Sequence, residues 1–273
     1  MRFSCTSMIA TALGALTISG CVWAQDTDTE ASSSEPRYGQ EGKDVVWVPT
    51  ADSLVARMLD MAQVTPDDVL VDLGSGDGRT VIAAARRGVP SRGIEYNADL
   101  VQVSRRAAEK AGVTDLARFE EGDIFESDFS EATVVTLFLL PALNLRLRPI
   151  LLDMKPGTRV VSNSFDMGEW QPDDVVEVER TDCQTWCRAY KWVVPAKVEG
   201  TWKTDDGELA LRQTFQMLEG TLRRDGDAVE LREARMDGTQ IRFTAGDRRY
   251  VGQVEGDVMR GTVDGDMPWS ATR

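Results

Sequence analysis

The segment Val71–Gly78, VDLGSGDG, places three glycines, at positions 74, 76 and 78, within five residues. An apolar run precedes it and the helix-like segment GRTVIAAARRG follows, which is the order strand, glycine loop, helix. In a parallel sheet such a loop lies at the carboxyl end of a strand, where bare backbone and free N–H groups can receive a ligand. A tight strand-to-helix turn without a ligand is the simpler alternative.

Strand-like and helix-like segments alternate from residue 68 to residue 165, which predicts a mainly parallel sheet with helices on both faces. After Trp170 the pattern favours an antiparallel pair around two cysteines. Beyond Pro195 short alternating runs are broken by Asp-Gly and Glu-Gly turns, which predicts a small all-β barrel or sandwich. We therefore expect an export signal (1–24), a flexible linker (25–44), an α/β domain (45–195) and an all-β domain (196–273).

Acidic residues mark the ends of three predicted strands. Glu95 ends RGIEY, at the position where an acid binds a ribose diol in nucleotide-binding sheets. Asp123 follows the next strand and could accept the exocyclic amine of an adenine. Asp72 directly precedes the glycines, where its charge would repel a diphosphate but suits a ligand with an ammonium and a sulfonium. The three acids predict a site for an adenosine without a pyrophosphate.

These motifs carry a family resemblance. VDLGSGDG, GIEYN and EGDIF stand at the intervals of the first three motifs of class I S-adenosylmethionine-dependent methyltransferases, which have a Rossmann-like sheet of seven strands. VPT, LFLLP and LRPILLDMKPGTRVVSNSFDMGEW further resemble the lysine methyltransferases that act on the ATP-synthase c subunit, and their bacterial relatives. The resemblance covers roughly residues 45–195 and implies S-adenosylmethionine as cofactor.

The resemblance also implies the residues that hold the cofactor. Asp72, Gly74 and Gly76 would contact the methionine part and Glu95 the ribose, whereas Asp123 and Ile124 would flank the adenine. The implied set also includes the covering segment Val48, Pro49 and Thr50 and the motif residues Ser75, Gly78 and Tyr96. Residues 137–141 would border the methyl acceptor.

The composition limits the chemistry. Histidine is absent, which excludes a Ser-His-Asp triad and a His-ligated zinc, and no metal site is expected. The net charge of −14 disfavours nucleic acid as a partner. Methyl transfer needs alignment and a dry site more than covalent help. Because TLFLLPALN contains no acid, the candidates to orient an acceptor are Asn144, Asn163 and Ser164, each of which could equally be a cap or turn residue.

The first two dozen residues have the pattern of an export signal: Arg2, an apolar run and small residues. Cleavage after Ala24 would release a soluble periplasmic protein. Alternatively, ISGC resembles a bacterial lipobox, which would make Cys21 lipidated, the only membrane attachment expected, and the product an outer-membrane lipoprotein. In an oxidising compartment Cys183 and Cys187 could close a disulfide loop.

The leading interpretation is an exported S-adenosylmethionine-dependent methyltransferase that acts on a protein side chain, with lysine as the expected acceptor. The alternative is a non-catalytic methyltransferase-like module that binds envelope components, and the complete set of Asp72, Glu95 and Asp123 argues against it. A dinucleotide-dependent oxidoreductase is disfavoured by Asp72 and by the absence of histidine for a proton relay.

Overall fold

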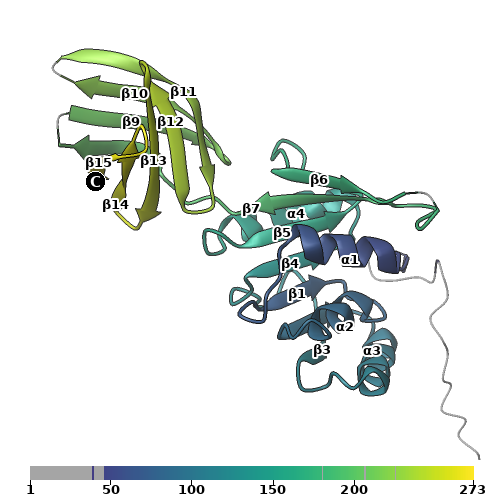
Figure 1. Ribbon diagram of the computed structural model, residues 1–273. Coiled ribbons are helices and arrows are strands. Elements are labelled where there is room, and N and C mark those ends of the chain that lie inside the picture. The colour runs from purple at the N-terminus through teal and green to yellow at the C-terminus, as the bar shows by residue number, and fades with distance from the viewer. Residues whose placement is uncertain (1–38, 40–45, 180, 206, 225) are drawn as a thin grey trace, which may run out of the picture. The chain divides into compact units, whose positions relative to one another are not determined.

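The computed structural model describes residues 39, 46–179, 181–205, 207–224 and 226–273. Figure 1 shows two β systems in this part of the chain, an open sheet with helices followed by a strand-only barrel. The predicted fold class is therefore confirmed. The export signal, Cys21 and nearly all of the linker lie outside the described residues, so those expectations stay predictions.

The open sheet has the strand order β3-β2-β1-β4-β5-β7-β6. Its strands are β1 (Leu70–Leu73), β2 (Ser91–Glu95), β3 (Ala117–Glu121), β4 (Val134–Leu137), β5 (Arg159–Asn163), β6 (Asp174–Glu177) and β7 (Arg188–Val193). β1 to β5 pair in parallel, whereas β7 runs antiparallel between β5 and β6. β1 pairs with β2 on one side and with β4 on the other, so β2 and β3 extend the sheet in one direction from β1, and β4 and β5 in the opposite direction. In open α/β folds, ligands bind where the strand order reverses in this way.

In the described part of the chain, four helices cover the two faces of the sheet: α1 (Asp52–Met61), α2 (Arg79–Ala85), α3 (Ala98–Ala111) and α4 (Pro141–Leu152). Side chains alternate between the faces along each strand. Accordingly Leu70 and Val134 pack in one cluster with α1, whereas their neighbours Val71 and Val135 pack in another with α4. α2 contributes to the α1 cluster and also packs with α3, so α1, α2 and α3 share one face and α4 covers the other.

Local sequence explains where the key elements begin and end. Asn97 caps α3, because its side-chain oxygen accepts from the backbone N–H of Asp99 at 2.9 Å, and Gly112 ends the helix in a left-handed conformation. Pro141 opens α4, where its missing N–H costs nothing. Between β6 and β7 a disulfide joins Cys183 to Cys187. No helix in the described part of the chain is long and apolar enough to span a bilayer.

The barrel is closed, because its last strand pairs with its first. Its eight antiparallel strands are β8 (Gly200–Thr204), β9 (Gly207–Thr214), β10 (Met217–Arg224), β11 (Asp227–Asp237), β12 (Gln240–Ala245), β13 (Arg248–Glu255), β14 (Val258–Val263) and β15 (Met267–Thr272). The aromatic residues Trp202, Phe243, Tyr250 and Trp269 are buried in its core. The expected boundary between residues 195 and 196 falls between β7 and β8.

Candidate functional site

The glycine loop connects β1 to α2 and is fixed to the neighbouring strand. The N–H groups of Gly74 and Ser75 both donate to the carbonyl oxygen of Ile94, at 2.9 and 3.1 Å. Gly78 has φ 80°, and a Cβ there would lie 2.7 Å from the ring of Phe119. This position therefore requires glycine for both its backbone conformation and its close packing.

Asp72 is buried beneath this loop, with 7% of its surface exposed. Its carboxylate accepts a hydrogen bond of 2.6 Å from the hydroxyl of Thr136, the residue paired with it on β4. Burial raises the pKa of Asp72 to about 7; the hydrogen bond from Thr136 opposes this shift, and the negative charges of Glu95 and Asp77 add to it. A buried carboxylate with this environment favours a cationic partner.

Glu95 stands at the end of β2 and faces the glycine loop. One carboxylate oxygen accepts from the N–H of Gly76 and the other from the N–H of Asn97, each at 2.9 Å. Each oxygen keeps a further lone pair, so the carboxylate can accept two hydroxyl groups without leaving its place. Beyond β3, a side-chain oxygen of Asp123 accepts from the N–H of Phe125 at 2.9 Å, which fixes the turn that contains Ile124.

The segment Val46–Thr50 lines the same pocket. The indole of Trp47 lies so close to Gly76 that a Cβ on Gly76 would collide with its Nε1. The guanidinium of Arg79 donates to the carbonyl oxygen of Thr50 at 2.8 Å and forms a 2.6 Å ion pair with Asp77, tying this segment to the start of α2. Sequence reasoning missed Trp47 and Arg79, although Trp47 adjoins the predicted Val48 and Arg79 adjoins Gly78.

One pocket brings together nearly all the predicted cofactor residues. Its walls include Val48, Pro49, Thr50, Asp72, Gly74, Ser75, Gly76, Glu95, Tyr96, Asp123 and Ile124. Gly78 is the exception, because it packs against Phe119 behind the loop. The pocket continues along Phe125, Phe138, Leu139 and Leu143, which supply an apolar wall. The individual contacts of these residues with a cofactor stay predictions.

The three candidates for orienting an acceptor do not line the pocket. Asn144 is fully buried, and its amide donates to the carbonyl oxygens of Phe165 and Asp166, both at 3.1 Å. Asn163 is also buried, and it donates to the hydroxyl of Thr50 at 3.1 Å while its amide oxygen accepts from Ser164 at 2.7 Å. These contacts give all three residues a role in positioning loops around the pocket.

The residues present fit S-adenosylmethionine. The described lining residues include four carboxylates, those of Asp72, Asp77, Glu95 and Asp123, and one guanidinium, that of Arg79. The pocket therefore favours a ligand with net positive charge. S-adenosylmethionine carries an ammonium, a sulfonium and one carboxylate. A dinucleotide would place its pyrophosphate against the carboxylate of Asp72. Within the described ranges, no three Cys, Asp or Glu residues gather in a way that could hold a metal ion.

Comparisons with known proteins agree with this site. Residues 72–174 match a family described as the ANTKMT methyltransferase domain. The chain is 46% identical over 138 residues to a protein-lysine N-methyltransferase of Saccharolobus islandicus (strain REY15A), a match that covers 50% of this chain and 86% of that protein. It is 42% identical over 105 residues to the mouse lysine N-methyltransferase of the ATP synthase c subunit, covering 38% of this chain and 42% of the mouse protein.

A crystal structure from Salinibacter ruber, described as an RNA methyltransferase in complex with S-adenosyl-L-homocysteine, is 52% identical with a TM-score of 0.52 and covers 55% of this chain and 96% of that one. The bound S-adenosylhomocysteine, the product form of the cofactor, identifies S-adenosylmethionine as the cofactor of this fold. With the archaeal match, these findings identify an enzyme rather than a non-catalytic module. The chain belongs to the family of S-adenosylmethionine-dependent methyltransferases that carry the ANTKMT methyltransferase domain and include protein-lysine N-methyltransferases.

Proposed function

We propose that this protein transfers the methyl group of S-adenosylmethionine to the side-chain amine of a lysine in another protein. The observation that carries the proposal is the 46% identity to the archaeal protein-lysine N-methyltransferase over 86% of that protein. The acidic cofactor pocket with its apolar wall at Phe138 and Leu139 supports it, because a sulfonium and a desolvated amine can meet there.

The residues of the pocket would each take part of the work. The carboxylate of Asp72 would hold the cofactor ammonium, Glu95 would accept the two ribose hydroxyls, and Asp123 with Ile124 would flank the adenine. When bound, S-adenosylmethionine supplies an activated methyl group. The acceptor lysine would lose its proton to solvent, and its neutral nitrogen would then take the methyl group that the bound cofactor supplies, with S-adenosylhomocysteine as the other product.

RNA is the second candidate acceptor, because the Salinibacter ruber structure is described as an RNA methyltransferase. The charge of this chain argues against it. Proteins that bind RNA neutralise phosphates with clustered Lys and Arg, whereas this chain has 45 acidic against 31 basic residues. We therefore favour a protein acceptor, and the same net negative charge would attract a lysine-rich segment.

We further propose that the protein works outside the cytoplasm, in the periplasm or, through a lipidated Cys21, at the outer membrane. The support is the signal pattern of residues 1–24 and the Cys183–Cys187 disulfide, since disulfides persist in oxidising compartments. Mass spectrometry of the mature protein from its native cells should find an amino terminus at Gln25 or a diacylated Cys21. An intact Met1 would contradict export.

The acceptor is tested by labelling. Purified protein with tritium-labelled S-adenosylmethionine is incubated separately with the protein and the total RNA of the native cells, and an Asp72→Ala variant serves as the inactive control. We expect label in protein only, released as methyllysine on acid hydrolysis and absent with the variant. Label in RNA, or in another amino acid, would overturn the lysine proposal.

A further inference from the structure

Three aromatic rings from distant segments meet beside the pocket. Phe138 follows β4, Phe165 follows β5, and Trp186 lies in the loop between β6 and β7. The ring centroids of Phe138 and Phe165 are 6.1 Å apart, those of Phe138 and Trp186 also 6.1 Å, and those of Phe165 and Trp186 5.2 Å. The three rings, which we call the aromatic cluster, therefore form one contact group.

The aromatic cluster runs from the cofactor pocket to the surface. Phe138 lines the pocket beside Leu139, whereas Trp186 is 43% exposed. A tryptophan left this exposed at the rim of a pocket is a frequent feature of recognition sites, because an indole offers a large contact area with few rotatable bonds. The cluster is thus continuous with the cofactor pocket at Phe138.

The loop that carries Trp186 is held in place from several sides. The disulfide between Cys183 and Cys187 closes the loop around Trp186, and Cys183 is buried. The hydroxyl of Ser53 on α1 donates to the carbonyl oxygen of Asp182 at 3.0 Å. Trp186 has φ 59°, a left-handed conformation that a bulky residue adopts only where its surroundings impose it.

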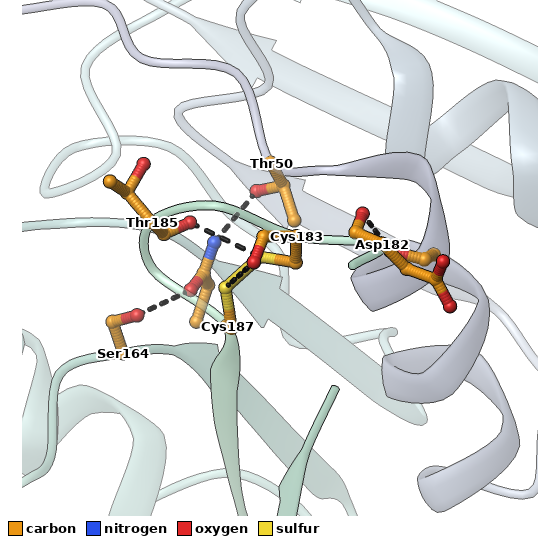
Figure 2. The surroundings of a disulfide bond; sticks show 8 residues. Thr50, Ser164, Asp182, Cys183, Thr185 and Cys187 are labelled. Atoms are coloured by element: carbon orange, nitrogen blue, oxygen red, sulfur yellow. Dashed lines mark hydrogen bonds between the residues drawn. A yellow bond between two sulfur atoms is a disulfide. The ribbon is translucent and has the colours of Figure 1, made fainter. Parts of the chain in front are cut away.

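Figure 2 shows this loop beside Thr50 and Ser164, and hydrogen bonds connect it to the cofactor pocket. The N–H of Ser164 donates at 2.7 Å to the carbonyl oxygen of Arg188, the residue after the disulfide. The hydroxyl of Ser164 donates to Asn163, and Asn163 donates to Thr50, which lines the pocket. The loop is therefore linked to one wall of the pocket through Ser164 and Asn163, whereas the contacts of Asp72 and Glu95 do not involve it.

The chemistry of the aromatic cluster matches a lysine side chain. Its rings can pack along the methylene stem, and their faces attract an ammonium or methylammonium group. Asp166 and Asp182, which adjoin Phe165 and Cys183 in the chain, are exposed and would attract the cation on its approach. A phosphate-bearing strand would meet repulsion at the same place.

We infer that Phe138, Phe165 and Trp186 form the subsite that receives the acceptor lysine, with Trp186 positioned there by the Cys183–Cys187 disulfide. This assignment rests on the proposed lysine methylation. Phe165 and Trp186, unlike Phe138, are not among the residues that line the cofactor pocket, so loss of either ring should weaken binding of the acceptor and leave binding of S-adenosylhomocysteine unchanged.

The test uses fluorine NMR of the full chain labelled with 5-fluorotryptophan and saturated with S-adenosylhomocysteine. The resonance of Trp186 is assigned with Trp186→Phe. We expect it to shift in a saturable way with N-acetyl-lysine methylamide, and not with the norleucine analogue, which has the same stem without the amine, or with uridine monophosphate. No shift with the lysine compound, an equal shift with norleucine, or a shift with the nucleotide would each overturn the inference.

Variants test the role of the disulfide and the rings. In Cys183→Ser/Cys187→Ser and in Phe165→Leu, affinity for the lysine compound should fall about tenfold, while the affinity for S-adenosylhomocysteine stays within twofold. Met217→Ala on the barrel, which also removes an exposed apolar side chain, should change neither. Equal affinity in all variants would overturn the inference. The proposed function fails separately, if the labelling experiment yields no methyllysine.

Discussion

Replacing Asp72 with asparagine should make the cofactor-free protein more stable at neutral and alkaline pH, although it removes a cofactor contact. Burial raises the pKa of this carboxyl from 3.8 to about 7. Between these two values the folded protein holds a proton that the unfolded chain has lost, so the stability of the wild type falls as pH rises from 4 to 7. The asparagine variant has no such proton, and its amide oxygen can still accept from Thr136.

The size of the effect follows from the shift. The raised pKa of Asp72 lowers the stability of the wild type by up to about 4 kcal/mol at pH 8 and by about 1.5 kcal/mol at pH 5, so the wild type should lose about 2.5 kcal/mol relative to Asp72→Asn between these conditions. Urea denaturation of both proteins at both pH values measures the difference. S-adenosylhomocysteine should stabilise only the wild type. A stability difference independent of pH, or one that favours the wild type more at pH 8 than at pH 5, would refute the reasoning.

Three further substitutions probe the site and its support. Glu95→Gln should weaken S-adenosylhomocysteine binding about tenfold in calorimetry, because an amide has one acceptor oxygen in place of two; unchanged affinity would argue against the ribose contact. Gly78→Ala should cost about 1–3 kcal/mol in urea denaturation, since its Cβ meets the ring of Phe119, and an unaltered midpoint would contradict this. Burial acts to raise the pKa of Asp68, but hydrogen bonds from Thr133, Thr65 and Arg159 outweigh it and lower that pKa. Asp68→Asn should therefore cost about 1–3 kcal/mol at pH 7 and less as the pH falls through the lowered pKa; an equal cost at pH 7 and pH 3 would disprove the assignment.

The parts of the site that follow from local sequence were predictable. Asp72, Glu95 and Asp123 end or follow adjacent strands, and parallel pairing brings such ends to one edge of the sheet, so strand spacing alone places them together. The three glycines belong to the same argument, although Gly78 packs behind the loop instead of lining the pocket.

The parts that depend on the path of loops were not predictable. Trp47 and Trp186 have no periodic pattern around them, and only the folded chain brings the first onto Gly76 and the second onto Phe165. Closure of the barrel could not be predicted either, because it depends on the pairing of β8 with β15, which lie at opposite ends of the barrel sequence. The turn residues in the sequence indicate only which consecutive strands pair. Asn163 ends β5 and Asn144 lies in the first turn of α4, but the sequence could not distinguish their buried contacts from those of acceptor-binding groups.

The most direct test of the central claim is calorimetric titration of the purified protein with S-adenosylmethionine. A separate titration with NAD represents dinucleotide ligands, and the Asp72→Ala variant is the control. The acid-lined pocket predicts saturable binding at one site, loss of that binding in the variant, and no heat from NAD. Absence of S-adenosylmethionine binding by the wild type, or equal binding by Asp72→Ala, would contradict the account.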